Sequence, residues 1–595
     1  MCKAPTKSLL LGSVLLSGLG LGSVAFAQTQ LLGEQPTSLV PLTQPTAPQP
    51  TLEELIPSQA ITSGGVQIDS LGGLDFDTVG TLDLGQGGFG YDMWRQSSLQ
   101  DVYALISNMP AQYSSRTGHS LARRLLLSSA GRPLDDRPLK SEEGLLALRL
   151  EKLAAMGAYA DLDNLLQRVP ARSDNETQAK IRTDSLLMVG KHDEACQVIQ
   201  GMAGNGQDSY WTRAMVFCHL FRGATDQALL GIDLLRETGT AEDPLFRELA
   251  LAGAGVETKF SGKSSGTVQP LHWAMSELSK SLLPAELDAF LDPGVRLALA
   301  GSQRYPADRR VAAAEAATMN GEMTAEQLVN LYSAYEFPVS ELDSVVSSEL
   351  IREGTQARAL FLQAAQLQTV PAARAEIIKA ALDHAEKDGL GLLMSRVIAP
   401  LVGEIPPSAD LAWFALPAGK TLYVAGNRPR GDEWLLLARQ YMLSEPTAAA
   451  SLTGLWPYAR LSGLEGGDRY GTLKGWASAQ GGTGPEVLNQ QLVLLRSCMQ
   501  GLGEDTRLSW GELASLELST PGLAPSAALL YALKDAQNGN RLAEVVLLSL
   551  IILGEEGPGD THSLALGNVV EALYSVGLPD DARALAIEAA ALSGI

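Results

Sequence analysis

Three glycines recur in one phase along the chain, at Gly157, Gly190 and Gly223, each 33 residues after the one before. Small or apolar residues follow each glycine at offsets of five, nine and twelve residues, namely Leu162, Ala195 and Ala228, then Leu166, Ile199 and Ile232, then Val169, Met202 and Leu235. The chain holds 59 glycines, so three alone could coincide. Four columns in phase indicate a structural repeat.

The repeat has a physical interpretation as a helical hairpin. A glycine that ends one helix can adopt a positive φ, and a small residue on the next helix lets the two helices approach closely. Each hairpin leaves one face unburied, which a neighbouring hairpin must cover. Gly577 and Ala582 repeat the glycine-to-alanine spacing near the C-terminal end. The pattern predicts an all-α chain, an α-solenoid of antiparallel helical hairpins.

Helix signals continue from Ser97 to the C-terminal end. Ser97 with Gln100, and Thr324 with Gln327, have the spacing of a capping box ahead of an apolar run. Pro371 stands where the first turn of a helix would begin, a position at which its missing N–H is not needed. No comparable series of alternating strands is present.

The first 27 residues have the pattern of a secretory signal peptide. Lys3 and Lys7 form a positive start, an apolar stretch follows, and Ala25-Phe26-Ala27 fits a cleavage site before Gln28. The apolar stretch is short and rich in glycine, which disfavours the alternative of a membrane anchor. We therefore expect export to the periplasm, with cleavage after Ala27.

Composition divides the remaining chain. Residues 28–65 are rich in Pro, Gln and Thr, which predicts a disordered linker. Residues 66–96 alternate apolar and polar residues around glycines, which predicts an irregular or β-hairpin cap. We expect N-terminal helical repeats over 97–270 and a C-terminal helical-hairpin array over 271–595.

Charge and hydropathy restrict the partners. The formal net charge is −22, which repels a phosphate backbone, so we expect no nucleic-acid partner. The most apolar run, 545–553, is less than half the length of a membrane-spanning helix. We therefore expect no integral membrane segment after signal cleavage.

The phased residues resemble tetratricopeptide repeats, two-helix units of 34 residues with Gly and Ala five positions apart. Tyr210 and Trp211 lie near the first aromatic position of that family. The resemblance implies a superhelix whose groove binds a peptide or protein, and it implies no catalytic residues. Ankyrin repeats share the 33-residue period, and Pro270-Leu-His-Trp-Ala274 resembles their signature, but that motif occurs once.

The chain as a whole resembles a group of uncharacterised exported proteins of Gram-negative bacteria. The shared segments are GGFGYDMWRQSS, the two-cysteine region, and LPDDARALAIEAA near the C-terminal end. Some members carry the automatic label "antifreeze glycopeptide polyprotein". Ice binding would need regular Thr ladders or Ala-rich tandem repeats with Thr, and neither is present in this sequence.

Three cysteines remain after cleavage, Cys196, Cys218 and Cys498. Their spacing fits no zinc motif, and a catalytic Cys–His pair, although open in principle, has no local signature here. Cys196 falls on the second helix of one predicted hairpin and Cys218 midway along the first helix of the next. In an oxidising compartment this placement predicts a Cys196–Cys218 disulfide, with Cys498 free and buried.

Motifs that would indicate chemistry are weak. Gly85, Gly87 and Gly90 form a G-x-G-x-x-G, but the preceding residues do not read as a buried strand and no second parallel strand follows. We predict no catalytic, metal or cofactor-binding residues. The expected function is a non-catalytic periplasmic scaffold or adaptor that binds an envelope protein or peptide. The alternative is an envelope enzyme, or accessory subunit, acting on peptidoglycan or another glycan.

Overall fold

The computed structural model describes residues 76–595, apart from 135–143, 170–174, 203–208, 238–242, 264–265, 347–351, 465–470 and 515–523. The predicted signal peptide, its cleavage site, the linker and the start of the cap lie outside the described residues. Within the described part the elements are helices, with isolated bridges and no strands, so the predicted all-α class is confirmed.

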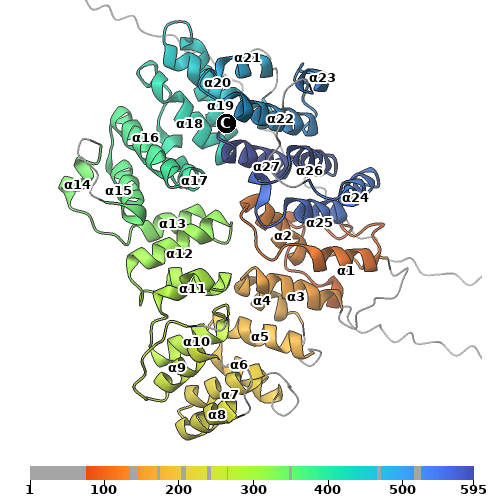
Figure 1. The fold of residues 1–595 in the computed structure, drawn as a ribbon, viewed down its shortest axis with the longest axis vertical. Helices are drawn as coiled ribbons and strands as arrows, with labels where there is room; N and C mark the ends of the chain where they lie inside the picture. Colours follow the sequence, from red (N-terminus) through yellow and green to blue (C-terminus); the bar gives the residue numbers. More distant parts are fainter. Residues whose placement is uncertain are drawn as a thin grey trace, which may run out of the picture. The chain divides into compact units, whose positions relative to one another are not determined.

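The helices follow one another at short intervals (Figure 1). The α-helices of the N-terminal half are α1 (Leu99–Asn108), α2 (Arg116–Leu127), α3 (Leu145–Ala155), α4 (Tyr159–Leu166), α5 (Glu176–Met188), α6 (His192–Met202), α7 (Ser209–Phe221), α8 (Thr225–Glu237), α9 (Pro244–Gly253), α10 (Pro270–Ser279) and α11 (Pro293–Gly301). Those of the C-terminal half are α12 (Ala307–Met319), α13 (Ala325–Tyr332), α14 (Val339–Asp343), α15 (Gly354–Leu367), α16 (Pro371–Lys387), α17 (Gly391–Glu404), α18 (Ala415–Val424), α19 (Arg428–Tyr441), α20 (Pro446–Leu461), α21 (Leu473–Ala479), α22 (Pro485–Gly501), α23 (Trp510–Leu513), α24 (Ala527–Asn538), α25 (Leu542–Leu553), α26 (Ser563–Ser575) and α27 (Pro579–Leu592). Short 3₁₀ turns are η1 (Phe76–Thr78), η2 (Leu84–Gln86), η4 (Ala285–Phe290), η5 (Ala409–Phe414) and η7 (Gly557–Gly559).

Neighbouring helices pack against each other as hairpins along much of the chain, among them α5 with α6, α7 with α8, α11 with α12, α18 with α19, and α26 with α27. The glycines predicted to form the turns lie between such helices. Gly157, Gly190, Gly223 and Gly577 have φ values of 71°, 77°, 74° and 89°. A residue with a Cβ adopts that conformation only at a cost, so glycine is favoured at these turns.

A second series of turn glycines continues the pattern. Gly389, Gly426 and Gly463 follow α16, α18 and α20, each 37 residues after the one before, and all have positive φ. The spacing differs from that of the first series, so a search for a fixed 33-residue period passes over it. The helical hairpin is thus common to both series, although its length changes.

The predicted caps have different outcomes. Thr324 and Gln327 form the predicted capping box at the start of α13. The box predicted at Ser97 is wrong, because α1 begins at Leu99 and its N-cap residue, Ser98, makes no side-chain capping bond. The Leu99 N–H donates instead to the Leu134 carbonyl at 2.8 Å. A tertiary backbone bond therefore replaces the side-chain cap.

The described part of the predicted cap, residues 76–96, contains η1 and η2 and no strand. Within its G-x-G-x-x-G, Gly85 belongs to η2, and Gly87 and Gly90 have positive φ. Asp83 caps η2 by accepting a bond from the Gln86 N–H at 2.9 Å. These glycines therefore serve tight turns in this segment.

Buried arginines join successive helices by hydrogen bonding to the last carbonyls of the helix before. Arg149 on α3 donates from Nε and Nη2 to the Leu126 carbonyl, at 2.9 and 2.6 Å. Arg182 on α5 donates to the carbonyls of Leu166 and Val169 at 3.0 and 3.1 Å. Because the last carbonyls of a helix lack intrahelical partners, each arginine satisfies them and fixes the next helix in place.

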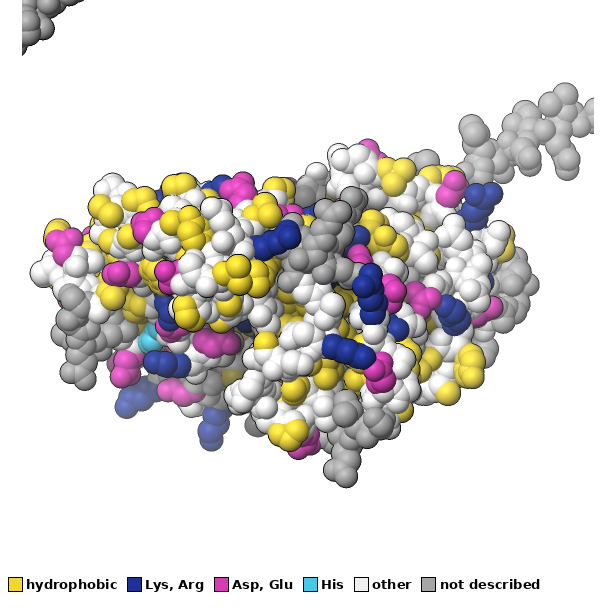
Figure 2. Space-filling model, turned by 90° about the horizontal axis from the view of Figure 1, so that it is seen from above, with side chains coloured by type: hydrophobic (Ala, Val, Ile, Leu, Met, Phe, Trp, Pro, Cys, Tyr) yellow, Lys and Arg dark blue, Asp and Glu magenta, His cyan; other side chains and the backbone are white. Residues whose placement is uncertain are grey.

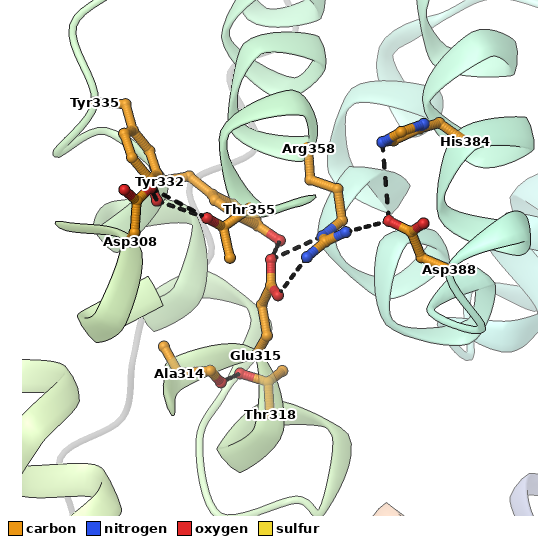
Figure 3. Close-up of polar contacts among 10 residues, drawn as sticks. All are labelled: Asp308, Ala314, Glu315, Thr318, Tyr332, Tyr335, Thr355, Arg358, His384 and Asp388. Carbon is orange, nitrogen blue, oxygen red and sulfur yellow. Dashed lines mark hydrogen bonds and ion pairs between the residues drawn. The ribbon is translucent and has the colours of Figure 1, made fainter. Parts of the chain in front are cut away.

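A buried ion cluster performs the same task in the C-terminal half (Figure 3). Arg358 on α15 donates from Nε and Nη2 to the two carboxylate oxygens of Glu315 on α12, at 2.8 and 2.7 Å. Tyr332 on α13 donates to Glu315 at 2.7 Å, and Asp388 after α16 accepts from Arg358 Nη1. Both oxygens of the buried Glu315 are thus satisfied by side chains of other helices, so we interpret the cluster as structural.

The helices nearest the C-terminal end pack on the first helices of the described chain. α25 contacts α1 and α2, and α27 contacts α2, α17, α18 and α20. One cluster of buried apolar residues accordingly combines residues of α1–α4 with residues of α24–α27, whereas a second cluster spans Ala179–Tyr305. This contact between early and late helices was not predicted from the sequence.

No helix among the described residues combines the length and apolar character needed to cross a bilayer.

Candidate functional site

The structure contains the predicted disulfide between Cys196 on α6 and Cys218 on α7, with the two Cα atoms 5.7 Å apart. Both residues are buried. Cys498, on α22, is free and buried, and burial raises the pKa of its thiol to about 12. The disulfide therefore joins one hairpin to the next, and Cys498 is protonated at neutral pH.

Two open cavities adjoin α2, and they share Arg116 and Ser120 in their linings. The first, called here the Arg396 cavity, measures about 450 Å³ and lies between α2, α17, the α18–α19 turn and α27. The second, the His119 cavity, measures about 810 Å³ and lies between α2, the α3–α4 turn, α11 and the α12–α13 turn. Of the predicted turn glycines, Gly157 lines the His119 cavity.

The surface of the molecule offers no comparable signal. The face in Figure 2 carries basic, acidic and apolar side chains intermixed, with no continuous block of one charge. We therefore take the two cavities along α2 as the candidate site.

Glu588 of α27 lies at the junction of three helices beside the Arg396 cavity. Its carboxylate accepts from Ser115 Oγ at 2.8 Å, from the Arg116 backbone N–H at 3.3 Å and from Arg396 Nη2 at 3.2 Å. Ser115 is the N-cap of α2 and accepts in turn from the Gly118 N–H at 3.1 Å. An anion at a helix N-terminus is stabilised by the unpaired N–H groups and by the helix dipole.

Arg396 is only partly satisfied by this arrangement. Its side chain is 7% exposed, and Glu588 takes up Nη2 alone. The buried Nε and Nη1 atoms have no hydrogen-bond partner among the described residues. A buried guanidinium with two unused donors is costly, and such a group indicates a functional constraint or a missing ligand.

Arg116 adds a second unused guanidinium to the same cavity. Its side chain makes no hydrogen bond or ion pair to another described residue. Partial burial and the positive charge of Arg396 lower the pKa of Arg116, against the opposing effect of Glu588. The mutual repulsion shows that the two guanidinium groups are close enough for one anion to interact with both.

The His119 cavity has a different character. His119 is buried, and burial together with the charge of Arg123 lowers its pKa to about 4, so the imidazole is neutral at pH 7. Arg123 forms a bidentate pair with Asp161, at 2.6 and 2.7 Å. Arg296 and Glu322, on opposite sides, also pair with each other. The charges around this cavity are therefore largely matched.

Two buried aspartates lie behind the wall of the His119 cavity. Asp184 accepts from the Tyr210 hydroxyl at 2.7 Å, and Asp292 accepts from the Tyr159 hydroxyl at 3.3 Å and from the Gly294 N–H at 2.8 Å. Burial raises the pKa of Asp184 to about 7, with a further rise from the charge of Asp292. Burial raises the pKa of Asp292 to about 6. Because tyrosines and backbone groups hold both carboxyls, we interpret the pair as a joint between α5, α7 and α11.

Sequence reasoning missed the Arg396 cavity, although a signal for it exists. Arg396 is the one charged residue within LLMSRVIAPLV, and Glu588 stands alone in LAIEAAAL. A lone charge inside an otherwise apolar helical run has to find a buried partner. Because 192 residues separate these two in the chain, the sequence did not show that they meet.

Comparisons with protein-family models, with curated proteins and with solved structures find no match to this chain.

Proposed function

We propose that this protein is a helical-repeat scaffold or adaptor of the cell envelope, and that it binds a protein or peptide partner along α2. The observation that carries the proposal is the pair of adjoining open cavities that share α2 as a wall. Each falls within the size range of ligand sites, and together they suit an extended ligand better than a compact one.

The arrangement of hairpins supports the same function. Stacked helical hairpins, as in tetratricopeptide-like α-solenoids, form long binding surfaces from side chains of successive units. The turns at Gly157 and at Gly321–Thr324 both contribute to the His119 cavity, so hairpins from two parts of the chain form one surface.

The envelope location rests on the signal-peptide pattern and on the cysteines. A disulfide between Cys196 and Cys218 is stable in an oxidising compartment such as the periplasm, and it is rare in the cytosol. The pairing supports export, because it would contribute little in a reducing environment.

Site-specific photocrosslinking in the host cell tests the proposal. A photoreactive residue at Ser120, which lines both cavities, is compared with one at Leu443, which is 95% exposed and lines neither. We expect a discrete ultraviolet-dependent adduct with a polypeptide at Ser120 and none at Leu443. Equal labelling at both positions, or no adduct at either, would overturn the assignment of a partner to α2.

A further inference from the structure

We infer that the Arg396 cavity is a binding site for a carboxylate ligand with an apolar body, held between Arg116 and Arg396. This site goes beyond partner binding along α2, because it requires neither a polypeptide ligand nor the His119 cavity.

The unused donors provide the first argument. Arg396 Nε and Nη1 are buried without partners, and the Arg116 guanidinium has no acceptor among the described side chains. An oxyanion in the cavity supplies acceptors for both groups, with a small rotation of the Arg396 guanidinium to turn its free edge outward. Hydrogen bonds from a guanidinium to a carboxylate are among the strongest in proteins.

Charge balance selects the kind of anion. Arg116 and Arg396 contribute two positive charges, and Glu588 contributes one negative charge. A monoanion such as a carboxylate neutralises the remainder, whereas a phosphate dianion leaves a net negative charge beside the buried Glu588. Burial of an unmatched charge is strongly unfavourable.

The other charged residues in the lining do not alter this balance. Asp581 accepts both of its contacts from Arg124 Nη1, at 2.8 and 2.9 Å, and Arg428 lies 3.4 Å from Asp432. Arg583 and Asp580 carry opposite charges and cancel. The uncompensated charge is therefore located at Arg116 and Arg396.

The walls of the cavity select the rest of the ligand. Leu392, Val424 and Ile587 line it together with Tyr423, so apolar surface lies close to the two guanidinium groups. A volume of about 450 Å³ suits a small molecule that carries one carboxylate and an aliphatic or aromatic group.

The ligand would contact helices that are far apart in sequence. Arg116 belongs to α2, Arg396 to α17, and Glu588, their shared neighbour, to α27. A ligand that binds only when these helices are together stabilises their junction, so it raises the unfolding temperature in proportion to its occupancy.

Calorimetry and thermal unfolding of the whole chain test the site with matched probes. N-acetyl-leucine carries the carboxylate and an apolar side chain, and N-acetyl-leucinamide is its neutral counterpart. For so small a probe we expect a dissociation constant on the order of 1 mM. We expect N-acetyl-leucine to bind and raise the unfolding temperature, and the amide to bind at least about tenfold more weakly.

Variants locate the binding to the two arginines. Arg116→Gln removes an exposed charge without breaking an internal contact, and we expect it to weaken N-acetyl-leucine binding by about tenfold. Arg396→Met combined with Glu588→Gln removes both members of the buried pair, and we expect no detectable binding. Arg236→Gln on α8 is the matched charge control, and it leaves the affinity unchanged.

Two further probes distinguish the source and charge of the ligand. An uncharged octapeptide that ends in leucine, with a free or amidated C-terminus, shows whether the carboxylate belongs to a chain end. The site is a subsite for the polypeptide partner if the free-ended peptide binds more tightly than N-acetyl-leucine, and a small-molecule site if it binds more weakly. Inorganic phosphate tests the charge argument, and we expect weaker binding than for N-acetyl-leucine.

The inference is overturned if the amide binds as well as the acid, if neither arginine variant changes the affinity, or if phosphate binds more tightly. These outcomes do not bear on crosslinking at Ser120. The carboxylate site and the proposed partner binding therefore stand or fall separately.

Discussion

Ser115 and Glu588 are 473 positions apart in the chain, and Ser115 Oγ donates a hydrogen bond to Glu588 Oε2 at 2.8 Å. Ser115 caps α2, near the start of the described chain, and Glu588 belongs to the last helix. The bond shows directly that the two ends of the helical array meet. Arg396, from the middle of the chain, reaches the same carboxylate.

Breaking the Arg396–Glu588 pair should destabilise this junction. We expect Glu588→Gln to lower the free energy of unfolding by about 3 kcal/mol, because it leaves Arg396 as a buried charge without a counterion. The double variant Arg396→Met/Glu588→Gln should regain much of that loss. Urea unfolding at pH 7 measures both values, and equal losses in the single and double variants would contradict the prediction.

The turn glycines should differ in their tolerance of alanine. Gly157 and Gly190 have similar positive φ, but a Cβ at Gly157 would lie 2.3 Å from the Gly294 nitrogen, whereas one at Gly190 meets nothing within 4 Å. We expect Gly190→Ala to cost about 1 kcal/mol, the conformational term alone. We expect Gly157→Ala to cost at least about 3 kcal/mol, because the backbone around Gly294 must move. Denaturant unfolding of the two variants checks this, and similar losses would show that the contact at Gly294 yields easily.

The disulfide should stabilise the α6–α7 region. Cys196 and Cys218 are separated by 22 residues, and closing a loop of this size contributes roughly 3 kcal/mol. We expect the double alanine variant to unfold at a lower temperature, and reductant to bring the wild-type protein close to that value. Reductant should not affect the variant. A wild-type unfolding temperature that is insensitive to reductant would contradict the prediction.

The buried Asp184 should make stability depend on pH. Its pKa is about 7 in the folded chain and about 3.9 in an unfolded one, so the folded state holds the proton more tightly. Its contribution to stability is complete below pH 4 and is lost as the pH rises through 7. We expect wild-type stability, measured relative to Asp184→Asn, to fall by up to about 4 kcal/mol between pH 4 and pH 8. The exposed Asp193→Asn is the control and should show no such trend, and parallel curves for wild type and Asp184→Asn would refute the assignment.

Local patterns in the sequence predicted the features that depend on neighbouring residues. Turn glycines, the cap at Thr324 and the placement of Cys196 and Cys218 on adjacent helices all follow from spacing within about one repeat. The cap at Ser97 was wrong because a carbonyl from Leu134 competes with the side chain. Local propensity decides an element only where no tertiary partner intervenes.

The candidate site could not be predicted in the same way. Arg396 and Glu588 signal buried charge, but spacing along the chain does not show which charges meet. The buried arginines are an intermediate case, since Arg149 and Arg182 share the 33-residue phase of the glycines. That phase could have identified them as a structural column of the repeat.

The bond between Ser115 and Glu588 also constrains how such a chain can evolve. An open stack of hairpins can gain or lose a unit at little cost, because each unit touches only its neighbours. Here an added or deleted hairpin would displace α27 from α2, and it would disrupt the Arg396 cavity at the same time. The copy number of hairpins is therefore expected to be fixed, with variation in length confined to the connections between helices.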